Sequence, residues 1–487
     1  MLDAPQRIAE LEAAVAAKDA LLATKDERIR ELEAQVAALL ARVAALTKQV
    51  GELAEKLGQN SRNSHRPPSS DSPGTGKPGG LRAKSGRPRG GQRGHRGSRR
   101  TLLPAAQVDD FVDLYPAACE NCWKTLPEIP DAHAKRYQVT EVPPIQPHTK
   151  EVRRHAVTCT CCGHRTRAAY DEQVIPASPF GPRLTSIVAL LTGVYHVSRR
   201  KTCSLLSDLL GVPISLGAVS AVEARVADAV KPAVDEAWTR VEGAAVKHTD
   251  GTSWLKAGAL LALWTIASTA ATVFKIVTDG SRATLAPLYG ALRGILVSDR
   301  ATALNFWAME RRQVCWAHLL RKFVSFTERA GPSAAFGREL LDYTGLLFEY
   351  WHNYKAGKLD RATFRAWMAP VRAQVEAVLA RAVAANIARL SGSCADLLEH
   401  KLALWTFVEH DGVEPTNNHA ERELRAFVMW RKRSFGTQSD RGNVFAERLM
   451  TVAHTARKQG REVLPFLTAC CEAHLAGTHA PSLFAAA

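Results

Sequence analysis

Strand-like and helix-like segments follow one another from residue 242 in an order that few folds accommodate. The segments AAVKHTD, ALLALWTIAS and ATVFKIVTD are rich in apolar and β-branched residues and are typical of three consecutive strands. The segment SRATLAPLYGALR is typical of a helix, and GILVSD of a fourth strand. The pattern therefore predicts a mixed α/β sheet domain in this part of the chain.

Acidic residues stand at the ends of the first and fourth of these strands. Three strands, a helix and a further strand is the core order of a ribonuclease-H-like fold, in which the first and fourth strands lie side by side. We therefore expect Asp250 and Asp299 to meet at one edge of the sheet. Taken alone, Asp250-Gly251 is also typical of a hairpin turn, and Asp299 of a helix N-cap.

A third acid, Glu421, begins a predicted helix that is crowded with Arg and Lys. Leu424 and Val428 follow it at steps of three and seven, which places the carboxylate on the apolar face of the helix. A carboxylate on that face needs a cation or a proton, although it can also simply complement the helix dipole. Helical phase favours Glu421 over Glu423 as a ligand, and Glu414 precedes the helix.

Three acids in these places are suited to binding divalent cations. Two Mg²⁺ ions about 4 Å apart activate a nucleophilic water or 3′-hydroxyl and stabilise the leaving oxygen of a phosphodiester. Hard cations prefer oxygen ligands, so Asp and Glu suit Mg²⁺ or Mn²⁺, whereas His and Cys select other metals. We expect Asp250 to bridge the two ions, with Asp299 on one and Glu421 on the other.

Basic side chains near Glu421 are placed to bind phosphates. The predicted DNA-binding set in this helix is Arg422, Arg425, Arg431, Lys432 and Arg433. A second pair of residues, Cys315 and His318, forms a CxxH motif between the second Asp and the Glu. A role in positioning the insertion or in contacting DNA is one interpretation of this pair, and a buried structural pair is the alternative. We do not predict a zinc site there, because two more ligands are not evident.

The first 58 residues carry a heptad repeat. Apolar residues alternate in steps of three and four, with Ile or Val mostly at a and Leu mostly at d, which favours a parallel two-stranded coiled coil. Of 15 core positions, 13 are apolar, and Lys18 and Lys25 are the exceptions. We expect residues 1–58 to form a coiled coil through which the chain makes a homodimer or a higher oligomer.

Residues 59–104 read as a basic disordered linker. The segment from Ser61 to Arg100 holds eleven Lys or Arg against one Asp, a net charge of +10 within a chain of formal charge +16. Such a density favours nucleic acid as a partner, and a solvated linker is the alternative. The GRPRGG stretch resembles a hook that lies in narrow minor grooves, which makes Arg87 and Arg89 candidate DNA contacts.

Two CxxC motifs follow at residues 105–175. Cys119 and Cys122 are separated by 36 residues from Cys159 and Cys162, a pattern typical of tetrahedral, structural Zn²⁺. Free cysteines or a redox pair are the alternative, and Cys161 is an extra thiol. The segments RYQVTEV and TKEVRRHAV between the motifs predict a small β-rich ribbon.

Residues 176–240 are predicted to be helical, with a break at GVPI that suits either a DNA-binding helix-turn-helix or a plain αα-hairpin. An all-α insertion is expected between the second Asp and Glu421, because no strand pattern interrupts that region. The expected catalytic core and its surroundings divide as follows: first part of the core 241–325, all-α insertion 326–410, second part of the core 411–460, and C-terminal element 461–487.

The segments HTDGTSW, VSDRATALN, CWAHLLRKF and EPTNNHAERELR…RKRSFGTQSDRG resemble the DDE-type transposases of the bacterial insertion sequence 66 family. NSRNSHRPPSSD and the paired CxxC motifs are similar to that family's N-terminal half. The resemblance implies Asp250, Asp299 and Glu421 as the catalytic triad of DNA strand cleavage and transfer. It also implies small accessory proteins of the same element as partners.

The sequence thus predicts a multidomain α/β protein. Its ribonuclease-H-like catalytic core with an all-α insertion would follow a coiled coil, a zinc-binding module and a helical, helix-turn-helix-like domain. The expected function is a transposase that cleaves element ends and joins the 3′-hydroxyls to target DNA. A non-catalytic DNA-binding protein and a structure-specific nuclease are the alternatives. Without an apolar run of 18 residues or a signal peptide, we expect a bacterial cytoplasmic, nucleoid-associated protein.

Overall fold

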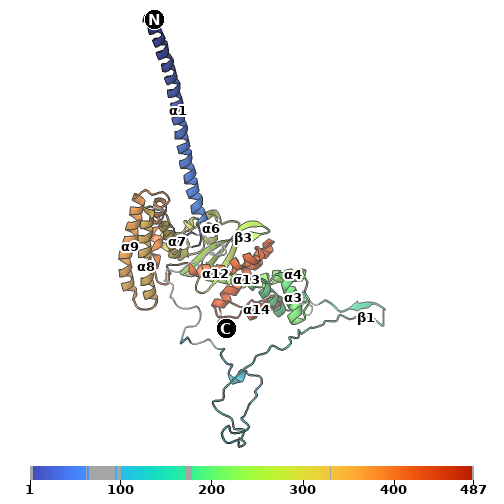
Figure 1. The fold of residues 1–487 in the computed structure, drawn as a ribbon. Coiled ribbons are helices and arrows are strands. Elements are labelled where there is room, and N and C mark those ends of the chain that lie inside the picture. Colours follow the sequence, from blue (N-terminus) through green and yellow to red (C-terminus); the bar gives the residue numbers. More distant parts are fainter. Residues whose placement is uncertain are drawn as a thin grey trace. The chain divides into compact units, whose positions relative to one another are not determined.

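A computed structural model describes residues 4–61, 63–64, 94–95, 100–170, 178–329 and 331–484 of the chain (Figure 1). The chain divides into two compact units. Unit 1 comprises residues 1–78, 245–249 and 294–419, and unit 2 comprises residues 79–244, 250–293 and 420–487. Two elements, strand β3 (Val246–Lys256) and helix α12 (Asn418–Ser434), run unbroken through a boundary between them.

A single helix, α1 (Ala4–Leu57), spans the heptad repeat and stops directly before Gly58. Its repeat positions are exposed in the single chain; Leu32 is 45% and Val50 is 64% accessible. The predicted long helix and its end are therefore confirmed. An apolar seam left in solvent is what a coiled-coil partner would cover, and dimerisation stays a prediction.

The central sheet has five strands in the order β5-β4-β3-β6-β7. Strands β4 (Ala259–Ala267) and β5 (Thr272–Val277) pair antiparallel, whereas β3 pairs parallel with β6 (Ile295–Ser298). Helix α6 (Arg282–Tyr289) connects β5 to β6. The expected three strands, helix and fourth strand are confirmed, and the first and fourth strands are neighbours.

The fifth strand, β7 (Arg312–Val314), was not predicted from the sequence. It is three residues long, pairs parallel with β6, and is fully buried although it contains Arg312 and Gln313. In a strand of three residues, two polar side chains hide the apolar pattern by which strands are predicted from sequence. Strand β3 is also longer than expected, because it continues past Asp250 to Lys256 and turns only at Ala257 and Gly258, which have positive φ.

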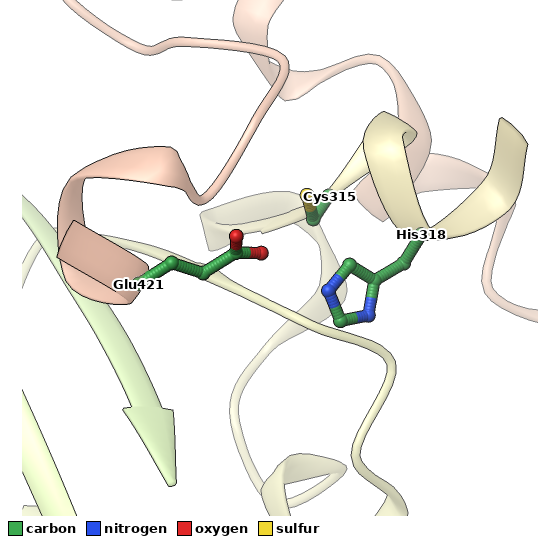
Figure 2. A group of neighbouring side chains, drawn as sticks. All are labelled: Cys315, His318 and Glu421. Carbon is green, nitrogen blue, oxygen red and sulfur yellow. The ribbon is translucent and has the colours of Figure 1, made fainter. Parts of the chain in front are cut away.

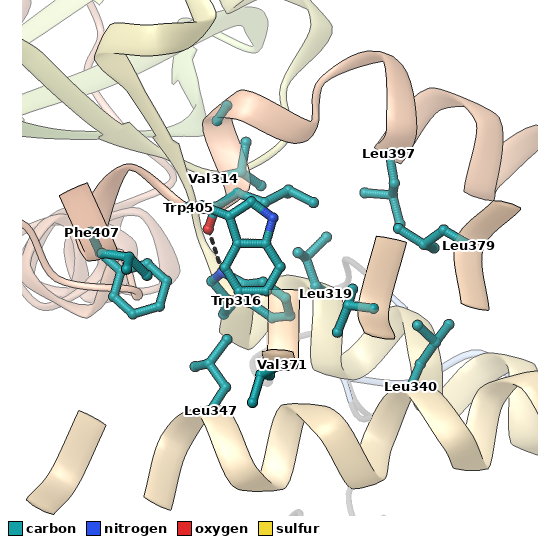
Figure 3. Close-up of a cluster of buried hydrophobic side chains, with 14 of the residues drawn as sticks. Val314, Trp316, Leu319, Leu340, Leu347, Val371, Leu379, Leu397, Trp405 and Phe407 are labelled. Carbon is teal, nitrogen blue, oxygen red and sulfur yellow. Dashed lines mark hydrogen bonds between the residues drawn. The ribbon is translucent and has the colours of Figure 1, made fainter. Parts of the chain in front are cut away.

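The segment after β7 is helical, and its described residues contain no strand, as predicted for the insertion. Its large aromatic side chains form one buried cluster in which Trp316, Trp405 and Phe407 pack together (Figure 3). The Trp316 indole N–H donates to the Leu404 carbonyl over 2.7 Å, which satisfies its only donor. The elements are α7 (Trp316–Thr327), α8 (Ser333–Lys355), α9 (Arg361–Ala384), α10 (Ser391–Glu399), η6 (Lys401–Leu404) and α11 (Thr406–Glu409), after η4 (Thr302–Leu304) and η5 (Met309–Arg311).

Between Ser178 and the start of β3, the structure has five helical elements: α2 (Pro182–Ala189), the π-helical turn η3 (Leu190–Val194), α3 (Arg199–Leu210), α4 (Leu216–Ala229) and α5 (Lys231–Glu242). Gly211 ends α3 in the left-handed conformation and so permits the turn to α4. The second helix of this pair, α4, buries Val219, Val222 and Val226 against α2, α13 and α14. A DNA-binding recognition helix also buries one apolar face, so both the helix-turn-helix and the αα-hairpin interpretations stay open.

Three helices complete the chain: α12, α13 (Asp440–Lys458) and α14 (Val463–Ala476). Helix α13 packs on β5, α4 and α5, and so covers one face of the sheet. The buried residues of α12 are Ala420, Leu424, Phe427 and Trp430. Glu421 and Val428 are only half-buried, so Glu421 lies beside the apolar face and not on it.

The region of the CxxC motifs is largely irregular. Within described residues, only η2 (Ala105–Gln107) and a hairpin of β1 (Ala156–Thr158) and β2 (Arg165–Arg167) are regular elements. The expected strand at RYQVTEV is absent, and the expected β-rich ribbon is reduced to this hairpin. Across the described residues, no helix is long and apolar enough to span a membrane.

Candidate active site

The parallel pairing of β3 and β6 determines where the two predicted aspartates lie. His248 is opposite Val297 in the register. Asp250 and Asp299 each follow two residues later along the chain: Asp250 is still within β3, whereas Asp299 comes directly after the last residue of β6. Both are half-buried. Because β3 continues past Asp250, the hairpin-turn interpretation of Asp250-Gly251 is wrong.

Gly251 has a packing role next to Asp250. A Cβ at Gly251 would come within 2.8 Å of the Trp264 ring on β4, so the indole lies directly over the glycine. The Gly251 N–H donates to Asp250 Oδ1 over 2.9 Å. The Gly251 N–H therefore orients the Asp250 carboxylate, and the Trp264 ring leaves no room for a side chain at position 251.

Asp299 lies in a loop held by the buried guanidinium of Arg312. The Asp299 carbonyl accepts hydrogen bonds from Arg312 Nη2 over 2.9 Å and from the Ser298 hydroxyl over 2.8 Å. The Arg312 group also donates to Ser298 Oγ, Asn305 Oδ1 and the Ala301 carbonyl. Asp299 Oδ1 in turn accepts from the Ala301 N–H over 3.0 Å. The carboxylate thus sits in a backbone turn fixed by these six hydrogen bonds.

Burial lowers the pKa of Arg312 to about 10, while the negative charges of Asp299 and Asp396 oppose that shift. The guanidinium therefore remains protonated at neutral pH. A buried cation that donates to the carbonyls of Asp299 and Ala301 is a feature that the sequence did not reveal, because a single Arg within a strand gives no pattern.

The start of α12 is tied to β3 at Thr249, the residue before Asp250. Asn417, which is fully buried, donates through Nδ2 to the Thr249 carbonyl over 2.7 Å and through its backbone N–H to Cys315 Sγ over 3.1 Å. The rings of His248 and His419 stack with centroids 5.0 Å apart. Helix α12 is continuous from this anchored start, and Glu421 lies in its first turn.

The one group of three potential metal ligands among the described residues contains Glu421. Its carboxylate, the Cys315 thiol and a His318 ring nitrogen lie within 4.8 Å of one another (Figure 2). Neither Asp250 nor Asp299 belongs to such a group. Cys315 and His318 were not predicted as ligands, because the chain separates them from Glu421 by about 100 residues and only the fold unites them.

The donor set decides which ion such a group suits. A thiolate, an imidazole and a carboxylate together are typical of Zn²⁺, whereas Mg²⁺ takes oxygen ligands. Glu421 is the one member that fits a magnesium site. It is thus the only residue that belongs both to this group and to the predicted acidic triad.

Comparison with protein families decides which kind of protein carries this arrangement. Residues 177–444, more than half of the chain, match the model described as "Transposase IS66 family". The chain belongs to the IS66 transposase family. Residues 22–101 match a family of unknown function (DUF6444). No curated protein matches the chain.

The matched region of this IS66 transposase includes all three predicted acids and both members of the CxxH motif. Transposases cut and join DNA, so membership in the family implies DNA as the substrate. The match ends at residue 444 and begins at residue 177, so it covers neither α1 nor the CxxC motifs.

The neighbouring acids of the transposase have other partners. Glu423 pairs with His454 Nδ1 over 2.5 Å and with Lys458 Nζ over 3.0 Å, and its side chain is 15% exposed. Burial alone would raise the pKa of Glu423, but the hydrogen bond from His454 and the charge of Lys458 outweigh it and lower the pKa to about 2. Glu414 lies near Lys355, 3.8 Å away. Both observations favour Glu421 as the acid of the site.

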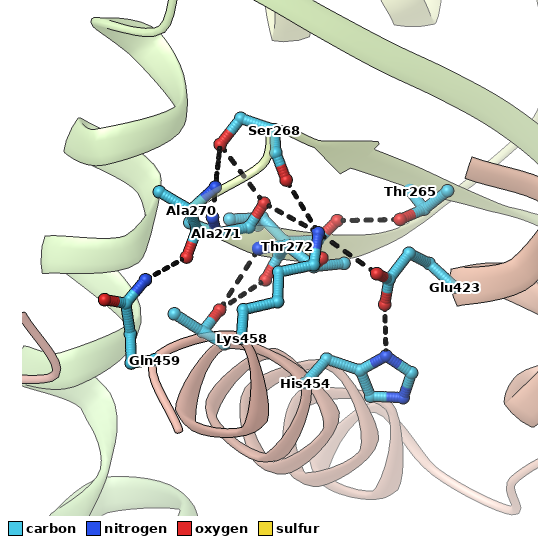
Figure 4. A network of polar contacts seen from close by, with 11 residues as sticks. Thr265, Ser268, Ala270, Ala271, Thr272, Glu423, His454, Lys458 and Gln459 are labelled. Carbon is cyan, nitrogen blue, oxygen red and sulfur yellow. Dashed lines mark hydrogen bonds and ion pairs between the residues drawn. The ribbon is translucent and has the colours of Figure 1, made fainter. Parts of the chain in front are cut away.

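Glu423 is part of a polar network that fastens α12 and α13 to the sheet (Figure 4). Lys458 Nζ also donates to the Ser268 carbonyl over 2.7 Å, and Gln459 Nε2 to the Ala270 carbonyl over 2.6 Å. Thr455 exchanges hydrogen bonds with the Thr272 backbone at the start of β5. The network fixes the helix that carries Glu421.

The predicted phosphate-binding residues of α12 divide into two groups. Arg431 is half-buried and donates through Nη1 to the Ser253 carbonyl and to Thr252 Oγ1, so it holds α12 on β3. Burial lowers the pKa of Arg431. The exposed members are Arg422, Arg425, Lys432 and Arg433. Arg87 and Arg89 lie outside the described residues.

Each CxxC motif forms a tight turn. The Trp123 N–H donates to the Cys119 carbonyl, and the Gly163 N–H donates to the Cys159 carbonyl, each over 2.9 Å. Backbone N–H groups of Cys122 and Asn121 lower the pKa of Cys119, and those of Cys162 and Cys161 lower the pKa of Cys159. The described structure does not bring the two pairs together as one ligand group, so the zinc site remains a prediction.

Proposed function

We propose that the chain is a DDE-type transposase whose Asp250, Asp299 and Glu421 bind two Mg²⁺ ions. In this proposal it hydrolyses the ends of its element to free 3′-hydroxyls and joins them to target DNA. The observation that carries the proposal is the parallel pairing of β3 with β6, which favours a position of Asp250 near Asp299, the residue that directly follows β6.

The strand order supports a ribonuclease-H-like core. An antiparallel β3-β4-β5 meander, a connecting helix, and β6 and β7 added in parallel beside β3 form the sheet order expected of that fold. The helical insertion lies between Asp299 and α12, where the predicted third acid follows. The Asn417–Thr249 hydrogen bond favours a position for Glu421 close to this part of β3.

The donor chemistry of the three acids fits Mg²⁺, since all three offer carboxylate oxygens. When bound, a pair of such ions activates the nucleophile and stabilises the leaving oxygen of the phosphodiester. Asp250 would contact both ions, Asp299 one and Glu421 the other. The exposed cations Arg422, Arg425, Lys432 and Arg433 would hold the DNA backbone by charge-assisted hydrogen bonds.

The N-terminal parts would pair and recognise two element ends. In the proposal, α1 forms a homodimeric coiled coil, the CxxC turns hold a structural Zn²⁺, and the basic segment containing Arg87 and Arg89 contacts DNA. A protein that must bring two ends together needs such a dimer, whereas a simple nuclease does not. Small accessory proteins of the same element would be further partners.

The test uses purified full-length protein, Mg²⁺ and labelled DNA that bears the terminal repeats of the element. We expect the wild type to produce 3′ nicks and joined products, and Asp250→Asn to lose both by about 10³-fold or more, as expected for loss of a transition-state charge contact. Glu414→Gln, a matched change just before α12, should retain activity.

Two results would contradict the proposal, one for the site and one for the reaction. Equal activity of Asp250→Asn and wild type would exclude the acidic triad as the catalytic site. Nicks without joined products, at every target DNA tested, would indicate the structure-specific nuclease instead of a transposase.

A further inference from the structure

A cavity of about 680 Å³ lies within unit 2, where the end of α12 and the start of α13 meet α3 and α4. Its volume is in the range of pockets that bind small organic molecules or single nucleotides, and is far too small for a DNA duplex. It is lined mainly by the segments 196–200 and 433–442, together with Glu223 and Trp430.

The wall of this cavity is strongly basic. Four arginines, Arg199, Arg200, Arg433 and Arg441, line it against a single acid, Glu223. Arg199 pairs with Glu223 over 2.5 Å, and Arg441 donates to Ser220 Oγ over 2.6 Å. Arg200 and Arg433 are exposed and no described acid pairs with them. The net positive charge favours an anion as the occupant.

One side of the cavity is aromatic. The His196 ring stacks on Trp430 with centroids 4.7 Å apart and an angle of 27°. Two further rings hold Trp430 in place: Trp254 packs edge-on against it, and Phe427 stacks with it. Burial lowers the pKa of His196 to about 4, so the ring is neutral at pH 7 and presents an uncharged face. Flat aromatic surfaces beside cations are typical of sites for unpaired bases.

The cavity is placed at a fixed distance from the proposed catalytic acid. Arg433 follows Glu421 by twelve positions on the continuous helix α12, which separates them by roughly 18 Å along its axis. Thr437 N donates to the Leu255 carbonyl and Gly436 packs against the Leu255 backbone, so the turn behind Arg433 is rigid.

We propose that this cavity binds an unpaired nucleotide of a DNA strand, with its phosphate on Arg200 and Arg433 and its base beside His196. The assignment of DNA as the source of the nucleotide rests on the proposed function. The strand would run along α12, so that the bound nucleotide lies several steps from the phosphate that is cut.

The experiment measures binding alone, in EDTA, by fluorescence polarisation of a labelled ten-nucleotide oligothymidylate with the full-length protein. We expect the double variant Arg200→Gln, Arg433→Gln to weaken binding by about tenfold or more, the loss expected for charge-assisted contacts. Gln438→Glu adds a negative charge at the cavity wall without removing a contact, and should weaken binding in the same direction.

Controls separate the cavity from general charge effects. Arg338→Gln, an exposed arginine of the helical insertion, should leave binding unchanged. A ten-base-pair duplex should lose less affinity than the single strand in the double variant. Equal losses for both DNA forms, or no loss in either cavity variant, would overturn the proposal. The proposal would also be overturned if free thymidine monophosphate competed as effectively as the unlabelled oligonucleotide.

Failure of the proposed catalytic function can be told apart from failure of the cavity proposal. If Asp250→Asn cleaves DNA as well as the wild type, the catalytic proposal fails, while the loss of single-strand binding in the cavity variants still supports this site.

Discussion

At the scale of single residues, Arg312 is the side chain on which the position of Asp299 depends most. We expect Arg312→Met to destabilise the fold by about 3 kcal/mol or more, since it leaves buried carbonyls without donors. Asn305→Ala removes one acceptor of the same guanidinium and should cost about 1 kcal/mol. Urea unfolding measures both changes.

Arg312→Lys keeps the charge but cannot reach four acceptors. If Arg312 positions Asp299, this variant should cleave DNA with a lower kcat at unchanged DNA affinity. A lower affinity with unchanged kcat would contradict the positioning role.

The ion pairs of Glu423 lead to a second prediction for a single residue. Its pKa of about 2 in the folded protein lies below the ordinary value of 4.5. The ion pairs therefore stabilise the fold fully above about pH 4.5, and this contribution is lost as pH falls towards 2. We expect Glu423→Gln to lower stability at pH 7 by on the order of 3 kcal/mol. The variant should also lose less stability than the wild type on acidification between pH 4.5 and 3, and equal losses would argue against the ion pair.

At the scale of elements, the exposed seam of α1 predicts a dimer. Leu39 lies on the seam, 61% accessible in the single chain, and Ala38 lies off it. We expect Leu39→Asp to shift the mass measured by sedimentation towards the monomer, while Ala38→Asp leaves it unchanged. A monomeric wild type would contradict the coiled coil.

The CxxC turns predict a metal that can be measured directly. We expect purified protein to contain one Zn²⁺ per chain, and Cys119→Ser to lose it, because thiolates favoured by backbone N–H groups are suited to zinc. Cys161→Ser is the matched control and should keep the metal. Protein without zinc under reducing conditions would refute the module.

How much the sequence could predict differs from element to element. The heptads of α1 and the apolar strands β3 to β6 carry their own periodicity, so their order was predictable. Strand β7 was not, because it is short and buries Arg312 and Gln313 through hydrogen bonds that only the fold supplies. RYQVTEV has strand-forming residues but no partner strand in the described structure.

At the scale of the whole molecule, the predicted site depends on contacts between distant segments. The sequence indicated each acid, and their proposed meeting depends on the parallel pairing of β3 with β6. The grouping of Cys315 and His318 with Glu421 could not be read from the sequence, since about 100 residues separate them in the chain. The choice between an acidic triad and a Cys-His-Glu group is therefore the central question for this transposase.

One measurement tests that choice directly. Fe²⁺ in place of Mg²⁺, with ascorbate and peroxide, cleaves the protein backbone beside the bound ion, and mass spectrometry locates the cuts. The account predicts cuts close to Asp250, Asp299 and Glu421, suppressed by excess Mg²⁺ and lost in Asp250→Asn. Cuts confined to the surroundings of Cys315, His318 and Glu421, unaffected by Asp250→Asn, would contradict it.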